Sequence, residues 1–458
     1  MLFQTQAFLL FFLPATLAVW YAAASKTRLR EWTLIFCSFV FYGWWDIRFI
    51  PLLAGQIVLS WLAARIFFAC RRRPRWLLVA AISANLSVLV FFKYWAFLAT
   101  NLLLAFGIDL PRPNIVLPIG ISFYTFEIIS YLADAAWREA PAYPFRRFTL
   151  FVSLFPRLIA GPIVRHHEIV PQFNYEPWRE GLAERLSKGA VWLIIGLVKK
   201  VFLADALAPI ANAHFAAAAS TTLSFGSAWS GALAFSLQLF LDFSAYSEMA
   251  IGVALMLGFT LPQNFDAPYR AVGLRDFWRR WHMTLSRYLR DYVYIPLGGS
   301  RSGEVQYIAA ILVTMALCGL WHGAGWTFLV WGLLHGAGLI LAHLWHRHGW
   351  PLPDAAAWLL TLLFVIAGWV VFRAPNLSIA AGMLKSMVGV NGFAGPLEMP
   401  VLIATAFAVS LLSPTTLSFV STHLKPKPVA ALLAAFAVTA VVLHVGDGQA
   451  QDFIYFQF

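Results

Sequence analysis

Long apolar segments separated by short polar ones run along almost the whole chain of 458 residues. Segments close to 20 residues are about long enough to cross the ~30 Å hydrocarbon core of a bilayer as helices. The pattern predicts an all-α polytopic membrane protein with about 11–13 membrane helices and a single domain over residues 1–458. The expected spans lie near 2–24, 33–49, 51–70, 76–96, 115–136, 186–208, 227–258, 305–322, 325–345, 356–374, 401–419 and 428–446.

Composition and charge agree with this pattern. The chain is 60% hydrophobic and 12% charged, whereas a soluble protein carries about 25% charged residues. Its net charge of +12 sits mostly in short loops such as 26–30, 71–75 and 138–147, which the positive-inside rule places in the cytoplasm. We therefore expect no nucleic-acid partner. The first apolar run, 8–21, precedes the first basic residues, which favours a retained span over a cleaved signal peptide.

Two kinds of irregularity interrupt the apolar segments. Segment 148–165 is broken by proline and glycine, so we expect a re-entrant or interfacial element that the rest of the protein covers. Charged residues also fall within predicted spans, where each costs about 2.5–3.5 kcal/mol at mid-bilayer. They are Glu127, Asp134, Lys199, Lys200, Asp242 and Glu248. Two interpretations of these charges are equally suitable: they pair between helices, or they have a functional role.

The most strongly charged segment is 262–301. Between Arg270 and Arg301 it holds seven arginines and two aspartates. On one continuous helix Arg275, Arg279 and His282 would share a face, which predicts an amphipathic helix at the cytoplasmic interface. Guanidinium groups bind phosphate oxygens bidentately, so a phosphorylated ligand and anionic lipid headgroups are both suitable partners.

A second segment, 317–336, places His322 between Trp321 and the glycines Gly323 and Gly325. A neutral imidazole in an apolar tunnel can act as a general base, although a histidine on a membrane helix is more often a structural hydrogen-bonding group. A third segment is the terminal Phe-Ile-Tyr-Phe-Gln-Phe, 453–458, which is too short to span a membrane. Tyr455 is its only nucleophile, and an interfacial aromatic anchor is the alternative interpretation.

The remaining chemistry-bearing residues are weaker candidates. The three cysteines, among them Cys318 one helical turn before His322, predict no disulfide framework. The sequence His166-His167-Glu168 resembles a fragment of a metal site but follows Gly-Pro in a loop. We therefore expect no metal site and no permanently bound cofactor.

Long blocks of the sequence resemble the membrane-bound O-acyltransferases, specifically the bacterial alginate O-acetyltransferase branch. The resemblance covers nearly the whole chain. The blocks are LPIGISFYTFEIISY (117–131), LFPRLIAGPI (154–163), QLFLDFSAYSEMAIGVALMLGF (238–259), the segment 264–301, LWHGAGWTFLVWGLLHG (320–336) and the terminal FIYFQF.

The resemblance implies a ring of helices around a central tunnel, with His322 as the catalytic histidine and His282 as a second functional histidine. It implies an acyl donor on the cytoplasmic side, acetyl-CoA, and transfer to an exported polysaccharide with the help of an extracytoplasmic esterase-like partner. Tyr455 matches a proposed acyl carrier. We expect the basic segment to bind the donor and the enzyme to lie in the bacterial inner membrane. The predicted donor-binding residues are Arg275, Arg279, Arg280, Arg290 and Trp281.

Two other functions fit the sequence. A transporter or flippase would use the buried charges to line a path. A D-alanyltransferase would take its acyl group from a carrier protein and pass it to teichoic acid. The terminal motif within this chain favours acetyl transfer, and the acceptor polymer is not specified by the sequence.

Overall fold

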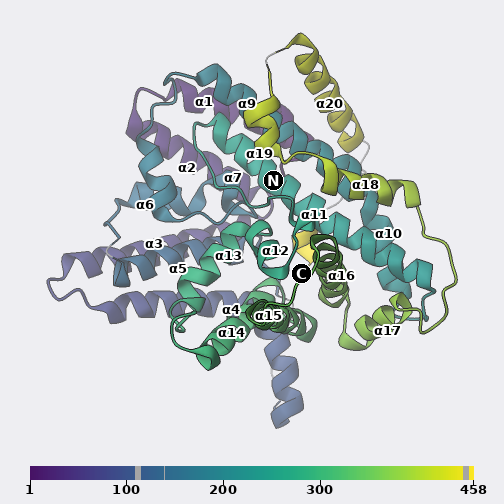
Figure 1. Ribbon diagram of the computed structural model, residues 1–458. Coiled ribbons are helices and arrows are strands. Elements are labelled where there is room, and N and C mark those ends of the chain that lie inside the picture. The colour runs from purple at the N-terminus through teal and green to yellow at the C-terminus, as the bar shows by residue number, and fades with distance from the viewer. Residues whose placement is uncertain (109–114, 139, 426, 447–452, 458) are drawn as a thin grey trace. The chain divides into compact units, whose positions relative to one another are not determined.

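The computed structural model describes residues 1–458 except 109–114, 139, 426, 447–452 and 458. The described residues contain α-helices, π-helical and 3-10 segments, and no strands (Figure 1). They form two compact units. Unit 1 comprises Met1–Ile194 and Tyr246–Pro262, and unit 2 comprises Ile195–Ala245 and Gln263–Phe458. The all-helical polytopic fold predicted from the sequence is confirmed, whereas the single domain stays a prediction.

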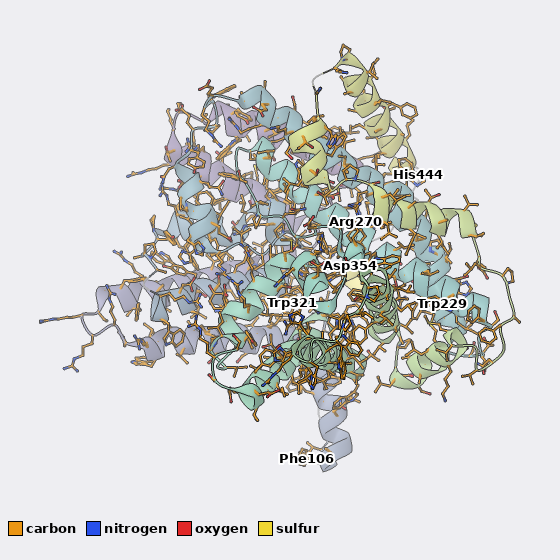
Figure 2. All side chains as sticks on the ribbon, in the orientation of Figure 1. Phe106, Trp229, Arg270, Trp321, Asp354 and His444 are labelled. Atoms are coloured by element: carbon orange, nitrogen blue, oxygen red, sulfur yellow. The ribbon has the colours of Figure 1, made fainter. Side chains whose placement is uncertain are left out.

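Unit 1 is built from the N-terminal helices. A π-helical segment, Ala7–Phe12, leads into α1 (Leu13–Ala22). The longer helices that follow are α2 (Thr27–Gly43), α3 (Ile50–Ala69), α4 (Arg75–Phe106) and α5 (Ile121–Trp137). The end of α4 projects outward, and Phe106 at its tip is 70% exposed (Figure 2).

The predicted interrupted segment lies in the interior of unit 1. Helix α6 (Phe145–Ser153) stops at Leu154, and the single turn α7 (Phe155–Leu158) follows with a proline in its first turn. Every residue from 148 to 164 is buried. Arg157 forms a buried ion pair with Glu127 of α5. The protein thus covers the non-helical backbone, as predicted, and Glu127 has a structural partner.

Unit 2 contains most of the helices that follow in the chain. They are α10 (Asp205–Ala217), α12 (Leu274–Arg280), α13 (Met283–Leu289), α14 (Glu304–His322), α15 (Trp326–Arg347), α16 (Asp354–Arg373), α17 (Leu377–Met387), α18 (Pro400–Leu412), α19 (Thr416–Ser418) and α20 (Pro428–Gly446). A 3-10 turn, Ile454–Gln457, contains the terminal tyrosine. Helices α9 (Leu182–Val198) and α11 (Phe225–Met256) each contribute residues to both units.

Seven helices among the described residues are long and apolar enough to cross a membrane, and the bent pair formed by α18 and Thr416–His423 makes an eighth if it is one span. This is fewer than the twelve spans predicted. The difference lies at 2–24, 33–49, 115–136 and 186–208. There the chain is helical, but its helices are short, carry charges or change to π-helical geometry.

The pair α14 and α15 shapes the region around His322. A β-carbon on Gly319 would overlap the carbonyl oxygen of Phe328, and one on Gly332 would overlap that of Met315. The glycines therefore allow the two helix backbones to approach closely, as small residues do between membrane helices. Helix α14 ends at His322, where Gly323 continues in an extended conformation.

Candidate functional site

The terminal segment docks inside unit 2 through a buried carboxylate. The backbone N–H of Ile454 donates a hydrogen bond of 2.8 Å to Oδ2 of Asp242 on α11. The other oxygen of Asp242 lies 3.1 Å from Nζ of Lys200, which also pairs with Asp205 at 2.6 Å. Phe453 and Ile454 are each 1% exposed. Asp242 and Lys200, two of the charges in the predicted spans, thus pair with each other. Asp242 also binds the tail and so positions Tyr455, the candidate nucleophile.

This docking brings Tyr455 to His322. The tyrosine hydroxyl forms a short hydrogen bond with Nδ1 of His322. Burial raises the pKa of Tyr455 well above its usual range, and the neighbouring Cys318 adds to that effect. The phenol is therefore neutral at physiological pH and requires a base to become a nucleophile. The imidazole in contact with it is such a base.

Aromatic rings enclose the pair. Trp321, Trp331 and Phe372 lie with their ring centroids 5.0–5.3 Å from that of His322. His322 and its neighbour Trp321 are each 4% exposed. These apolar rings lower the local polarity around the imidazole, which strengthens electrostatic interactions there, while Tyr455 is half-buried.

His282 lies in the same aromatic cluster. Its ring contacts Phe243 at 4.7 Å and Trp321 at 5.8 Å, and Phe243 also contacts Tyr455 at 4.7 Å. His282 is fully buried, and burial lowers its pKa to about 3, so the ring is neutral. The backbone at His282 is left-handed, with φ of 42°, a conformation that costs about 1–2 kcal/mol for a residue with a β-carbon.

Asn264 fixes the orientation of this second histidine. Its Oδ1 lies 3.1 Å from Nδ1 of His282 and also accepts hydrogen bonds from Thr284. An amide oxygen can only accept, so Nδ1 carries the proton and Nε2 holds the lone pair. Nε2 has no hydrogen-bond partner within the described part of the chain. It is thus a buried acceptor on a ring that packs within the aromatic cluster.

The predicted amphipathic helix is wrong in one respect. The helix is interrupted after Arg280, because Trp281 is extended and His282 is left-handed. Arg275 and Arg279 on α12 are exposed, whereas His282 turns into the interior. The three residues therefore do not share a face. The hydrogen bond that His282 donates to Asn264 and the packing on Phe243 stabilise the inward position of His282.

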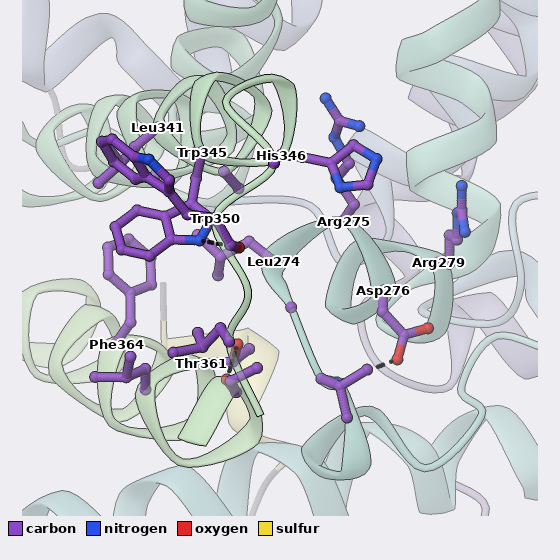
Figure 3. A pocket seen from close by; sticks show the side chains of 18 residues that line it. Leu274, Arg275, Asp276, Arg279, Leu341, Trp345, His346, Trp350, Thr361 and Phe364 are labelled. Carbon is purple, nitrogen blue, oxygen red and sulfur yellow. Dashed lines mark hydrogen bonds between the residues drawn. The ribbon is translucent and has the colours of Figure 1, made fainter. Parts of the chain in front are cut away.

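Arg275 and Arg279 line a cavity of about 830 Å³ between α12, α15 and α16 (Figure 3). Its wall is otherwise largely apolar and includes Leu341, Trp345 and Phe364. Arg275 donates a hydrogen bond of 2.7 Å to His343. On the other side of α12, Trp278 and Arg290 line a smaller cavity of about 160 Å³ with Thr314 and Met315 of α14. Thr314 and Met315 precede His322 on the same helix by about two turns.

Comparison with known proteins places this arrangement in a family. The membrane-bound O-acyltransferase family model matches residues 134–381. A probable alginate O-acetylase from Pseudomonas aeruginosa is 42% identical, with 84% of this chain and 75% of the relative aligned. A peptidoglycan O-acetyltransferase from Helicobacter pylori is 38% identical, with 86% and 80% aligned. A teichoic acid D-alanyltransferase from Streptococcus thermophilus is 29% identical over 50% of this chain and 57% of its own length.

The chain belongs to the membrane-bound O-acyltransferase family. It is an acyltransferase and a multi-pass membrane protein. This decides against a transporter or flippase.

The other predicted donor-binding residues of this acyltransferase lie in different environments. Arg280 pairs with Asp276 at 2.9 Å, and Arg290 pairs with Asp291 at 2.7 Å. Trp281 is 2% exposed and stacks on Phe277 in the aromatic core. The structure therefore brings His322, His282 and Tyr455 into one cluster, while of the five predicted donor residues Arg275, Arg279 and Arg290 line cavities.

Two residues of this acyltransferase acquire a role only in three dimensions. Asp242 anchors the tail and Asn264 sets the tautomer of His282. The signal for Asp242 was its charge within an apolar run. Asn264 carried no local signal, because it precedes its partner by 18 residues and nothing in the spacing of an asparagine and a histidine predicts their contact.

Proposed function

We propose that this acyltransferase is an O-acetyltransferase of the bacterial cytoplasmic membrane that takes acetyl from acetyl-CoA and passes it toward an exported polysaccharide. The observation that carries the proposal is the hydrogen bond between the hydroxyl of Tyr455 and Nδ1 of His322. Relatives named for acetylating alginate and peptidoglycan support the acceptor class.

In the first step His322 acts as general base. The tyrosine hydroxyl donates to Nδ1 of the tautomer that carries its proton on Nε2. As the phenol oxygen attacks the thioester carbonyl, its proton moves to Nδ1, the new C–O bond forms and the C–S bond breaks. The departing thiolate takes that proton and leaves as free coenzyme A. General-base assistance of this kind contributes about 10²–10⁴-fold in rate.

In the second step the acetyl group leaves Tyr455. A sugar hydroxyl, presented directly or through an esterase-like partner on the outer side, attacks the aryl ester while His322 accepts its proton. The C–O bond to tyrosine breaks, and the phenolate regains a proton from the imidazolium. A covalent intermediate divides one difficult transfer into two easier ones. It also suits a membrane enzyme, because only the small acetyl group has to pass between the two substrates.

The neutral His282 has a supporting role in this proposal. Its Nε2 lone pair lies in the aromatic cluster that contains Phe243 and Trp321. In that position it can accept a hydrogen bond from an amide N–H of the donor arm. Such a contact would orient the thioester toward Tyr455, and correct orientation alone accounts for large rate factors.

The donor is proposed to place its phosphates at Arg275 and Arg279. The larger cavity has the size of a small-molecule site, about 300–1,000 Å³, and two arginines on successive helical turns suit a diphosphate. In the experiment, Arg279→Gln is compared with Arg301→Gln, an exposed arginine that lines neither cavity. Arg279→Gln should raise KM for acetyl-CoA with little change in kcat. Equal KM values in both variants would contradict this assignment.

The central test uses the purified full-length enzyme. After incubation with acetyl-CoA, mass spectrometry of the C-terminal peptide should find one acetyl group on Tyr455. Tyr455→Phe and His322→Ala should lack it, and Tyr175→Phe, an exposed tyrosine of unit 1, should retain it. If Tyr455→Phe still acetylates the cell-surface polymer at the normal rate, Tyr455 is not the carrier.

The D-alanyltransferase relative supports one competing function, transfer from a carrier protein. The two are separated by the donor. Release of coenzyme A from acetyl-CoA by the purified enzyme supports acetyl transfer, whereas turnover that requires an aminoacylated carrier protein supports the competitor.

A further inference from the structure

A second polar cluster lies in unit 1, where the end of α5 meets α8 (His166–Ile169). Asp134 of α5 and the adjacent residues His166 and His167 each offer one atom that can bind a metal, and these atoms all lie within 4.8 Å of one another. Nε2 of His166 is 3.2 Å from Oδ2 of Asp134. Asp134 and His166 are buried, while His167 is exposed.

The distance between His166 and Asp134 suits a tetrahedral metal ion. Zinc binds imidazole nitrogen at about 2.0–2.1 Å and carboxylate oxygen at about 2.0–2.2 Å. Two ligands at the tetrahedral angle are therefore roughly 3.3–3.5 Å apart, close to the separation of His166 and Asp134. Two imidazoles and one carboxylate are also a donor set that suits borderline ions such as Zn²⁺.

The surroundings of His166 match those of a metal-bound histidine. A ligating histidine usually hydrogen-bonds through its other ring nitrogen, which fixes the ring. Nδ1 of His166 lies 2.9 Å from the hydroxyl of Tyr143, and the ring of Tyr131 packs against it with centroids 5.4 Å apart. With a metal on Nε2, Nδ1–H donates to the tyrosine oxygen. Without a metal, the tyrosine hydroxyl donates to Nδ1 and Nε2–H donates to Asp134.

The charged side chains next to this cluster have other partners or are partly exposed to solvent. Glu168, the third member of the His-His-Glu sequence, accepts a hydrogen bond from the backbone N–H of Arg165 and so caps α8. Arg138 lies 3.5 Å from Asp134, with 43% of its side chain exposed, so it can turn toward water when a cation binds.

We propose that Asp134, His166 and His167 form a binding site for a divalent transition-metal ion, best matched by Zn²⁺, with a fourth position open to water on the exposed side of His167. The site is independent of the proposed acetyl transfer, because it lies in unit 1 and uses none of the residues of the tyrosine–histidine cluster. The sequence alone predicted no metal here, since a histidine pair without a third ligand is a weak signal. The third ligand comes from a helix that ends about 30 residues earlier in the chain.

The test uses full-length protein purified in detergent, stripped with a chelator and titrated with Zn²⁺ or Co²⁺ alone. Co²⁺ in a tetrahedral site gives intense visible absorption, so it reports geometry as well as binding. The wild-type protein should bind one more ion per chain than a variant that lacks the site. His167→Ala, an exposed position with little risk to folding, should weaken binding at least 10-fold, and Asp134→Asn should abolish the tetrahedral Co²⁺ spectrum.

Two controls separate this site from adventitious binding. Glu168→Gln and His348→Ala should leave the affinity unchanged, since Glu168 caps a helix and His348 follows α15 in unit 2. Tyr143→Phe should weaken binding about 10-fold, as loss of an outer-shell partner does. If wild type binds no more Zn²⁺ than His167→Ala, or if His348→Ala lowers binding equally, the cluster is a hydrogen-bonded Asp134–His166–Tyr143 triad and the proposal is wrong.

Discussion

One of the hydrogen bonds that dock the C-terminal tail can be removed with little other change. Ile454 begins the 3-10 turn and donates its N–H to Asp242. Proline is tolerated at the first position of a helical turn, where its fixed φ is suitable. Ile454→Pro therefore deletes the donor, while Ile454→Ala retains it and loses a comparable amount of side chain.

The expected magnitude follows from the charge of the acceptor. Hydrogen bonds to charged groups contribute about 1.5–3 kcal/mol, and each 1.4 kcal/mol corresponds to about tenfold in an equilibrium constant. Ile454→Pro should therefore shift the docking equilibrium by about 10- to 100-fold relative to Ile454→Ala. Asp242→Asn keeps a neutral acceptor and should lie between wild type and Ile454→Pro.

The assay is digestion of the purified protein by a carboxypeptidase, followed by intact-mass spectrometry. When opening and closing are fast relative to cleavage, the digestion rate follows the fraction of undocked tail. Ile454→Pro should be digested about 10- to 100-fold faster than Ile454→Ala. Equal rates in the two variants would refute the claim that the Asp242 hydrogen bond holds the tail.

Three further predictions concern the rest of the molecule. His322→Ala should reduce polymer acetylation, measured as ester content of the cell surface, by about 10²–10⁴-fold, and normal ester content would contradict its role as a base. His282 has a pKa of about 3 in the folded protein and about 6.5 in the unfolded chain. The stability that it contributes is fully present above pH 6.5 and is lost as pH falls toward 3, because in that range only the unfolded chain binds the proton. At pH 5 this loss is about 2 kcal/mol, so His282→Gln should show a smaller drop in thermal stability between pH 7 and pH 5 than wild type, and an equal drop would count against it. Gly319→Ala should destabilise the protein by about 1–3 kcal/mol or more because its β-carbon overlaps a backbone carbonyl. Gly336→Ala should be milder, because its β-carbon would lie 3.2 Å from the flexible end of Leu312 and 3.4 Å or more from other atoms; thermal unfolding in detergent compares the two variants.

Several features of this protein follow from the sequence because they depend on local composition and spacing. Apolar segments about as long as a bilayer is thick require helices, since backbone groups in lipid must be hydrogen-bonded within their own segment. The prolines and glycines of segment 148–165 predicted an interruption of the helix, and the structure has that interruption. His322 and Tyr455 could be named from their sequence blocks. The number of membrane spans was predicted less well, because short or charged helices such as α2 and α5 carry a weaker signal of membrane crossing than α16 does.

The tertiary structure decided which of these residues meet. Tyr455 and His322 are 133 positions apart, and their contact depends on a carboxylate on α11 that binds the tail. The same holds for Asn264 with His282, where a left-handed residue ended the predicted helix and turned the histidine inward. In unit 1, Asp134 joins the histidine pair only because α5 and α8 pack together. Local patterns determine helices and candidate chemistry, but contacts between distant segments depend on the packing energy of the whole fold, which no single stretch of sequence contains.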